Sequence, residues 1–233
     1  MMPKISCIII TFNEEKCLPH LLNSLKKQTY KNFEIIVSDN NSKDKTRQIA
    51  RSFGCKIVQG GLPARARNNG AKHAKSDLLI FFDADTTLHK NLLKEILKEF
   101  NYRNLDVAGV NLVPITDSKF DKLLHKVYNL WQILIQKIDP HLSGACIIIK
   151  KKVFSNIGGF DESLMVAEDH ALARKAKKKK YKFGILHNYI FLDIRRLKKE
   201  GNFKFTFKLM FFWFRRLFGE IKKSKVKYDL NAR

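Results

Sequence analysis

Two aspartates separated by one residue follow an uninterrupted apolar run in the stretch LLIFFDAD, residues 78–85. The run is typical of a strand that is covered on both faces of a sheet. Ionised carboxylates are costly to bury without partners, so Asp83 and Asp85 need a compensating charge. A hard divalent cation prefers such oxygen ligands and can take its remaining ligands from phosphate groups and water. The alternative is an ordinary turn in which an aspartate caps the next helix.

Two further strand-like runs also end in polar residues. The run ISCIIIT ends in Thr11, with Asn13 and Glu14 close behind, and the run FEIIVSD ends in Asp39. In open α/β sheets, ligands bind at the carboxyl ends of the strands. Together with Asp83 and its neighbour, these ends predict an acidic rim that would hold a metal ion and a diphosphate.

The elements that position these side chains alternate between strand and helix. Leucines at i, i+3, i+4 and i+7 from Leu18 predict an amphipathic helix, and Gly54 marks the end of the next one. Strands are expected at 5–11, 33–39, 55–59, 78–83, 106–115 and 142–151, and helices at 18–25, 43–54, 64–75, 90–100, 119–138 and 170–180. This alternation with short links predicts an α/β fold with a mostly parallel, Rossmann-like sheet flanked by helices.

Composition limits the class of protein. A chain of 233 residues with 45% hydrophobic residues fits one large domain, or one domain with an appendage. Its formal net charge of +23 indicates a polyanionic neighbour, such as nucleic acid, an anionic membrane or a phosphorylated ligand, unless it only reflects a lysine-rich source. The four cysteines form no CxxC pair and are interpreted as buried thiols. Neither a signal peptide nor a bilayer-spanning segment is expected.

Five short motifs occur in a fixed order: SCIIITFNEE, FEIIVSDNNSKDKT, ARNNGAKHAKSDLLIFFDADT, GGFDE and EDHALARKAKKKKYKF. Together they resemble the family 2 glycosyltransferases with a GT-A fold, over roughly residues 4–200. The resemblance implies that a sugar is transferred, with inversion, from a UDP- or GDP-linked donor, usually with Mn²⁺ or Mg²⁺. It also favours a metal-binding DxD motif over an ordinary turn for the two aspartates.

The resemblance places the donor nucleotide at the first two strand ends. Thr11, Asn13 and Glu14 match the segment that lines the nucleoside pocket, and Asp39 matches the aspartate that reads the base. The sequence SDNNSKDKT replaces the commoner DDGSTDGT there, which leaves the identity of the base open. Asparagine tolerates the left-handed conformation nearly as glycine does, so the turn itself can survive. Arg67, in ARNNG, matches a donor-site arginine, with a solvent-facing helix residue as the alternative.

The acidic residues have separate roles in the resemblance. Asp83 matches the position that faces the ribose and the metal, and Asp85 matches the direct metal ligand. Asp169, in the stretch AED, matches the general base that deprotonates the acceptor hydroxyl as it attacks the anomeric carbon, and Glu168 supports it. These two acids also suit the first turn of a helix, where the helix dipole favours carboxylates, and both interpretations can hold.

Other parts of the resemblance concern the acceptor and the leaving group. Gly144 matches part of the acceptor wall. The stretch HNYIFLDIRRLKKEG resembles a closing segment of small family members, in which His187, Arg195 and Arg196 would approach the departing diphosphate and stabilise its charge. A structural histidine and a surface arginine pair are the alternatives.

The last part of the chain differs in character from the rest. We expect residues 1–202 to form the GT-A domain and residues 203–233 a basic amphipathic extension. In this extension cations gather on one helical face and aromatic and leucine side chains cover the other, which predicts an interfacial helix on anionic lipid, with packing on protein as the alternative. These features predict a cytoplasmic enzyme, peripheral on the inner face of the cell membrane, that glycosylates a lipid-linked glycan, a glycolipid or a cell-surface polysaccharide.

Three other functions would share some of these features. A polyprenyl-phosphate sugar synthase would share the donor site. A nucleotidyltransferase needs a glycine-rich loop with a lysine after the first strand, and TFNEEKC is not such a loop. A nucleic-acid-binding protein would carry basic residues interleaved with aromatic ones on its binding face, without an acidic rim, so no nucleic-acid partner is expected.

Overall fold

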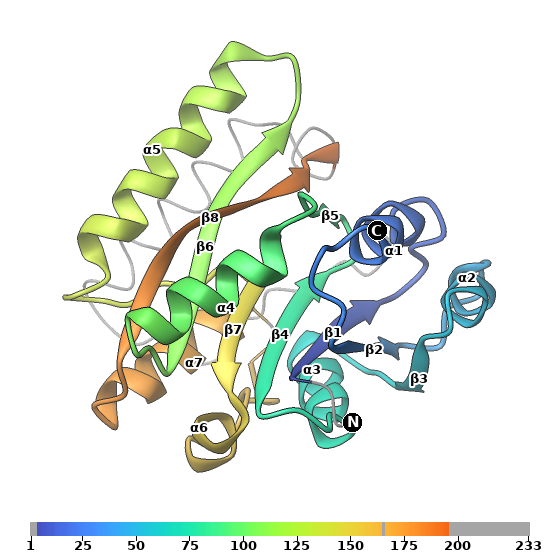
Figure 1. The fold of residues 1–233 in the computed structure, drawn as a ribbon, viewed down its shortest axis with the longest axis horizontal. Coiled ribbons are helices and arrows are strands. Elements are labelled where there is room, and N and C mark those ends of the chain that lie inside the picture. Colours follow the sequence, from blue (N-terminus) through green and yellow to red (C-terminus); the bar gives the residue numbers. More distant parts are fainter. Residues whose placement is uncertain (1–3, 165, 196–233) are drawn as a thin grey trace.

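The computed structural model describes residues 4–164 and 166–195. The strands are β1 (Ile5–Thr11), β2 (Phe33–Asp39), β3 (Lys56–Gln59), β4 (Leu78–Asp83), β5 (Thr86–Thr87), β6 (Val107–Ile115), β7 (Cys146–Lys150) and β8 (Phe183–Asp193). The helices are α1 (Leu18–Lys26), α2 (Thr46–Ser52), α3 (Pro63–Lys72), α4 (Leu92–Tyr102), α5 (Lys119–Ile135), α6 (Lys151–Asn156) and α7 (Glu168–Lys178). Figure 1 shows these elements as one sheet with helices on both of its faces.

The strands form one sheet in the order β3-β2-β1-β4-β7-β6-β8-β5. Its first half is parallel, as predicted, because β1 pairs in parallel with β2 and β4, and β2 with β3. Its second half is mixed: β7 runs antiparallel to β4 and β6, and β5 antiparallel to β8, whereas β6 and β8 are parallel. The α/β class is confirmed, although the sheet is mixed beyond β4.

Most predicted elements are present within a few residues of their expected bounds. The strand predicted over 142–151 is shorter, because residues 141–145 precede β7 as loop and turn and α6 begins at Lys151. The stretch that was interpreted as a closing segment instead contributes most of strand β8. Arg196 and the predicted extension 203–233 lie outside the described residues.

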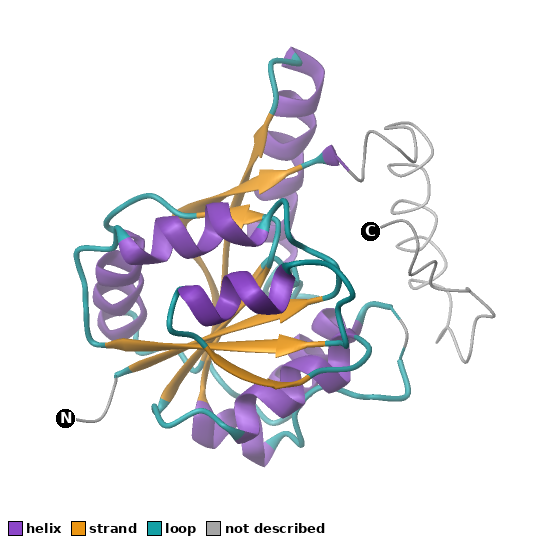
Figure 2. Ribbon diagram, turned by 90° about the vertical axis from the view of Figure 1, so that its right-hand side faces the viewer, coloured by secondary structure: helices purple, strands orange, loops and turns teal. Residues whose placement is uncertain are grey.

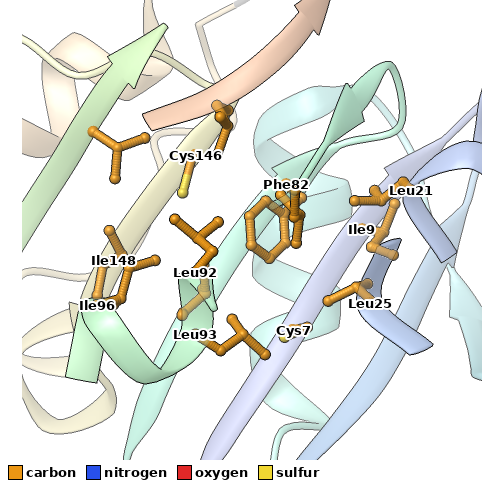
Figure 3. Packing of buried hydrophobic residues seen from close by; sticks show 14 of the residues in the cluster. Cys7, Ile9, Leu21, Leu25, Phe82, Leu92, Leu93, Ile96, Cys146 and Ile148 are labelled. Carbon is orange, nitrogen blue, oxygen red and sulfur yellow. The ribbon is translucent and has the colours of Figure 1, made fainter. Parts of the chain in front are cut away.

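Two apolar clusters hold helices against the two faces of the sheet. On one face, Phe82 packs in a cluster with Leu21 and Leu25 of α1 and Ile96 of α4 (Figure 3). On the other face, the neighbouring Phe81 packs in a cluster with residues of α3, α6 and α7. Adjacent strand residues point to opposite faces, which is why an unbroken apolar run suits this doubly covered strand.

Two of the cysteines belong to the apolar core. Cys7 and Cys146 are buried in the cluster shown in Figure 3, and all four cysteines of the chain have free thiols. Burial raises the pKa of Cys7 and Cys146, which keeps both thiols protonated. The prediction of buried thiols is confirmed for Cys7, Cys17 and Cys146, whereas Cys55 is half-buried.

Helix α5 occupies an outer edge of the molecule, beyond β6 (Figures 1 and 2). Within residues 4–164 and 166–195, no helix combines the length and the apolar character that crossing a bilayer requires.

Candidate active site

The carboxyl ends of β2, β1 and β4 lie side by side, as the acidic rim requires. Thr11 is in register with Asp39, and Ile10 is in register with Asp83. The hydroxyl of Thr11 donates a hydrogen bond of 2.9 Å to Asp39 Oδ1, and both side chains are buried. The structure therefore brings the acids of two predicted strand ends to one edge of the sheet.

Asp39 is held by the turn that follows its own strand. Ser42 donates to it twice, from its backbone N–H to Oδ2 at 3.0 Å and from its hydroxyl to Oδ1 at 2.6 Å. Asn41 adopts a left-handed conformation with φ of 55°, so asparagine supports the turn here as predicted. Gly60 lies against this turn, where an added Cβ would meet the carbonyl carbon of Asp39 at 2.6 Å. The backbone around Asp39 is thus fixed by hydrogen bonds and closely packed, and it forms one wall of the site.

Asn13 and Glu14 connect the end of β1 to the same turn. Asn13 is left-handed, with φ of 53°, and its Oδ1 accepts a hydrogen bond of 2.8 Å from the N–H of Lys43. The N–H of Glu14 donates to the hydroxyl of Thr46 at 2.7 Å, and the residue is buried. These contacts fix the segment that the resemblance assigns to the nucleoside.

Arg67, from the second turn of α3, is the centre of the site. Its Nη1 donates to Glu168 Oε1 at 2.6 Å and its Nη2 to Asp83 Oδ1 at 2.8 Å. The guanidinium also lies 5.4 Å from the centre of the Phe160 ring, within cation–π range. Burial alone would lower the pKa of Arg67, but Asp83 and Glu168 together hold it above its usual value. The predicted donor-site arginine is therefore a buried cation, not a solvent-facing residue.

Asp169 lies beside this cation at the start of α7. Its Oδ2 accepts a hydrogen bond of 2.8 Å from the N–H of Gly144, and its Oδ1 one of 2.8 Å from the N–H of His170. Burial raises the pKa values of Asp169 and Glu168, although Arg67 opposes the shift. A carboxylate with a raised pKa is a stronger base than an ordinary aspartate, which suits proton abstraction from a hydroxyl.

Gly144 joins the two halves of the site. Besides donating to Asp169, it accepts a hydrogen bond of 3.4 Å from Arg67 Nη2 through its carbonyl oxygen. A Cβ at this position would come within 2.6 Å of the same Nη2 atom. The residue predicted to form part of the acceptor wall thus contacts both the base and the buried arginine.

Asp83 and Asp85 fit a divalent cation by their chemistry and their exposure. Ala84 between them is buried, whereas both aspartates are partly exposed, and the Asp83 side chain is 32% exposed. One oxygen of Asp83 binds Arg67, so Asp85 is the better placed of the two to bind a metal directly. Within the described residues no three His, Cys, Asp or Glu side chains form a complete metal cluster. A cation here would need donor phosphate oxygens and water as further ligands.

Of the three cationic residues predicted near the diphosphate, Arg195 is close to this rim. The backbone N–H of Asp193, two residues before it, donates to the carbonyl oxygen of Asp85 at 2.9 Å. Arg195 Nε pairs with Asp193 Oδ2 at 2.6 Å, and its guanidinium contacts the thiol of Cys17. The pKa of that thiol is raised to about 12, chiefly by burial and also by the nearby carboxylates of Glu14 and Asp85, while Arg195 lowers it.

His187 is not brought to the site, contrary to expectation. Its side chain is 91% exposed, and its Nδ1 pairs with Glu99 of α4 at 2.8 Å. It precedes Asp193 by six residues of extended β8, which separates it from the Asp85 backbone by about 20 Å at roughly 3.3 Å per residue. The motif around it resembles a closing segment, and in the structure its first seven residues lie in strand β8, which separates His187 from Arg195.

Several residues of the site were not predicted. Ser42 orients Asp39, Phe160 covers Arg67, and the rings of His141 and His170 stack with their centres 3.5 Å apart beside Asp169. The only sequence signal for the histidines is their position: His170 directly follows Asp169, and His141 lies three residues before Gly144. Neither position shows from spacing alone that the two rings meet.

Comparison with known proteins shows the family of the chain. The family model "Glycosyl transferase family 2" matches residues 6–158. The chain is 30% identical over 190 residues to the poly(ribitol-phosphate) β-N-acetylglucosaminyltransferase TarS of Staphylococcus aureus, an alignment that covers 75% of this chain and 32% of TarS. It is 31% identical over 123 residues to the GalNAc(5)-diNAcBac-PP-undecaprenol β-1,3-glucosyltransferase of Campylobacter jejuni, covering 48% of this chain and 39% of that protein.

Solved structures show the same fold. Residues 1–349 of S. aureus TarS in complex with UDP-GlcNAc superpose with a TM-score of 0.68 at 26% identity, covering 82% of this chain and 59% of that one. A mannosyltransferase from Pyrobaculum calidifontis, in complex with GDP-Man and Mn²⁺, gives a TM-score of 0.69 at 20% identity, covering 83% and 58%. The chain thus spans about a third of the whole TarS protein. Because the family model matches well over half of its residues, the chain belongs to glycosyl transferase family 2.

Proposed function

We propose that the protein transfers a sugar, with inversion, from a nucleoside diphosphate donor to an acceptor hydroxyl. The observation that carries this proposal is the buried cation Arg67, which ties Asp83 of the donor rim to Glu168, the neighbour of the base. This arrangement holds Asp169 beside the rim at which the donor would bind. Donor and acceptor would then meet at a fixed geometry, which is a main source of rate in group transfer.

In the proposed reaction Asp169 takes the proton of the acceptor hydroxyl as the oxygen attacks the anomeric carbon. The bond from that carbon to the diphosphate breaks on the opposite side, and the nucleoside diphosphate leaves as an anion. The hydrogen bonds from Gly144 and His170 orient the carboxylate for this step. Arg195 is a candidate to stabilise the leaving group, because it is tied to the backbone next to Asp85.

The walls around Asp39 would take the base and ribose of the donor. Thr11, Asn13 and Glu14 would complete this pocket, which has fixed backbone on two sides. The likeness to TarS supports UDP-GlcNAc as the first donor to test, with GDP-linked sugars as the alternative. Asp85, with Asp83, would hold Mn²⁺ or Mg²⁺, which would neutralise charge on the diphosphate when bound.

The acceptor is proposed from the relatives and from the chain's charge. TarS acts on poly(ribitol-phosphate), and the C. jejuni relative on a glycan carried by undecaprenol diphosphate. Both acceptors are anionic, and a chain with a net charge of +23 would attract such molecules. We therefore propose a lipid-linked glycan or an anionic cell-surface polymer as acceptor, at the cytoplasmic face of the membrane, with a polyprenyl phosphate as the alternative.

A donor screen tests the proposed function. The purified protein would be incubated with Mn²⁺ and a panel of UDP- and GDP-sugars, and release of the nucleoside diphosphate would be measured. We expect slow hydrolysis of one donor, and we expect Asp85→Ala to abolish it. Asp77→Ala is the control and should leave hydrolysis unchanged, because Asp77 is an exposed residue just before β4. The proposal would be contradicted if calorimetry detected no binding of any nucleoside diphosphate and no donor were hydrolysed.

A further inference from the structure

Helix α5 has its polar and apolar faces the opposite way round from an ordinary surface helix. Asp121 and Gln132 are buried against the domain, and Asn129 also points inward. Its exposed side chains are largely apolar. A surface helix of a globular protein normally turns its apolar face to the core, so the reversal needs two explanations, one for each face.

The inward face is polar because it completes an open strand. In the part of the chain that the structure describes, β7 pairs with β6 only over Val107 to Gly109, and no strand continues along that edge of β6. There Asn129 both donates to the carbonyl oxygen and accepts from the N–H of Leu112, each at 2.9 Å. Gln132 donates to the carbonyl oxygen of Val110 at 3.3 Å. Side-chain amides thus replace the missing strand, since buried backbone groups must be paired.

The outward face is an apolar row at helical spacing. Its members recur at intervals of three and four residues and are each between 54% and 68% exposed: Phe120, Leu123, Val127, Leu130 and Leu134. At about 100° per residue they lie within an arc of roughly 80°. We call these five residues the α5 row. It runs the length of the helix, and Figure 1 shows α5 at the outside of the molecule. A continuous exposed row of this kind marks an interaction surface.

The charged residues that α5 itself exposes are all of one sign. Lys119, Lys122 and Lys126 are exposed and lie on one flank of it, between about 20° and 80° beyond its edge. The only acidic residue of α5 is Asp121, which is buried. A row of large apolar side chains with lysines along its flank is the pattern of a helix that lies in a lipid interface. We propose that the α5 row docks onto an anionic membrane surface.

The helical spacing of the α5 row would also suit two protein occupants, a second copy of the chain or its own segment 203–221. The charges favour anionic lipid over both. A second copy of the chain would place its own lysines against those of α5, with no exposed acid on either helix to offset them. The segment 203–221 of the same chain has eight aromatic residues, four cations and one acid, so it would add like charge to that flank. An anionic lipid surface supplies the opposite charge.

A series of ring contacts connects α5 to Asp169, the proposed base. The rings of Trp131 and His141 lie 4.7 Å apart, centre to centre, and His141 stacks on His170, whose backbone N–H binds Asp169. Docking through the α5 row would therefore hold the base near the membrane. The proposal concerns lipid binding alone, which can be measured without donor or acceptor, so it does not depend on the proposed reaction.

Vesicle co-sedimentation of the full chain tests the proposal. The probes are vesicles of phosphatidylglycerol with phosphatidylcholine, and vesicles of phosphatidylcholine alone. We expect the wild type to prefer the anionic vesicles, and the double variant Leu123→Gln/Leu130→Gln to lose about tenfold or more of its partition coefficient. The matched control is Tyr102→Gln, which removes a 90% exposed ring from α4 and should bind like the wild type.

Two further double variants separate the contributions of the α5 lysines and of the extension from that of the α5 row. Lys119→Gln/Lys126→Gln should weaken binding at low salt and little at high salt, because salt screens charge but not apolar contact. Phe211→Gln/Phe214→Gln, in the extension, measures how much the extension contributes to vesicle binding, for comparison with the α5 variant. Equal urea midpoints and equal UDP binding would show that the variants are folded and that their donor sites are unchanged.

Three results would overturn the proposal. The wild type could stay in the supernatant with both kinds of vesicle. The extension variant alone could abolish binding while the α5 variant sediments within about twofold of the wild type, which would make the extension the anchor. The wild type could form a dimer in analytical ultracentrifugation that Leu123→Gln/Leu130→Gln dissociates with no change in vesicle binding, which would make a second copy the occupant.

Discussion

Arg67 Nη1 lies 2.6 Å from Glu168 Oε1 and joins helix α3 to the first turn of α7 across 101 residues of the chain. The contact is enclosed, because 3% of the Arg67 side chain and 11% of the Glu168 side chain are exposed. A buried ion pair adds little stability compared with an apolar pair, but removal of one partner leaves an unpaired buried charge. The same residue therefore supports both the packing of α7 and the position of the base.

We predict that Arg67→Met lowers the free energy of unfolding by about 3–5 kcal/mol, the usual cost of breaking a buried pair. The carboxylate of Glu168 would then be buried without a counter-charge. Urea denaturation measures the change. Arg65→Met, at an exposed position of the same helix, is the control, and Arg67→Met/Glu168→Gln should regain part of the loss. Equal destabilisation by the two single arginine variants would show that the pair is not structurally important.

The first half of the fold was predictable because its signals are local. Apolar runs with polar ends identified β1, β2 and β4, and the leucine spacing from Leu18 identified α1. Since parallel strands bring their carboxyl ends to one edge, the neighbourhood of Asp39 and Asp83 followed from the strand assignments. The direction of β7 did not follow, because an apolar run has the same pattern in parallel and antiparallel pairing.

The missing parts of the site depend on contacts between distant segments. Arg67 was predicted as a donor-site residue, but its ion pairs reach 16 residues to Asp83 and 101 residues to Glu168. No local pattern encodes such a contact. His187 shows the opposite error, because its motif resembles a closing segment that would approach the diphosphate, whereas the residue pairs with Glu99 of α4 from a strand.

We predict that Asp169→Asn keeps donor binding but lowers the rate of transfer by about 10²- to 10⁴-fold, the usual range for a lost general base. The amide is nearly the same size as the carboxylate but accepts a proton far more weakly. Calorimetry with UDP and a transfer assay with an accepted acceptor measure the two effects. Asp117→Asn, at an exposed position before α5, is the control. Transfer within a few-fold of the wild type would remove Asp169 from this role.

The pH dependence of transfer should show an acid limb above the ordinary pKa of an aspartate, which is about 3.9. Burial raises the pKa of Asp169, and the base must be ionised to accept a proton, so the rate should fall as pH falls through that raised value. The limb should be absent from the residual activity of Asp169→Asn. A limb at or below the ordinary value in a plot of kcat against pH would contradict the assignment.

The same shift has a consequence for stability with a definite sign. The folded chain holds the Asp169 proton more tightly than the unfolded chain, because burial raises the folded pKa. The stability contributed by this group is therefore present below the unfolded pKa and is lost as pH rises through the folded one. Urea midpoints of wild type and Asp169→Asn should converge at low pH and separate in favour of the variant as pH rises. A constant difference across that range would mean that the carboxylate is not under strain from burial.

The last prediction concerns the metal. Asp85 lies at the end of β4, and its partner Asp83 already gives one oxygen to Arg67, so Asp85 should dominate any metal binding. We predict that Asp85→Ala abolishes the Mn²⁺-dependent part of UDP affinity and leaves the urea midpoint close to that of the wild type, because the side chain is partly exposed. Calorimetry with UDP, with and without Mn²⁺, measures the effect. Asp77→Ala, just before the start of the same strand, should keep the full metal dependence. If Asp85→Ala keeps it as well, the cation is held elsewhere, and if the wild type shows none, this site binds its donor without a metal.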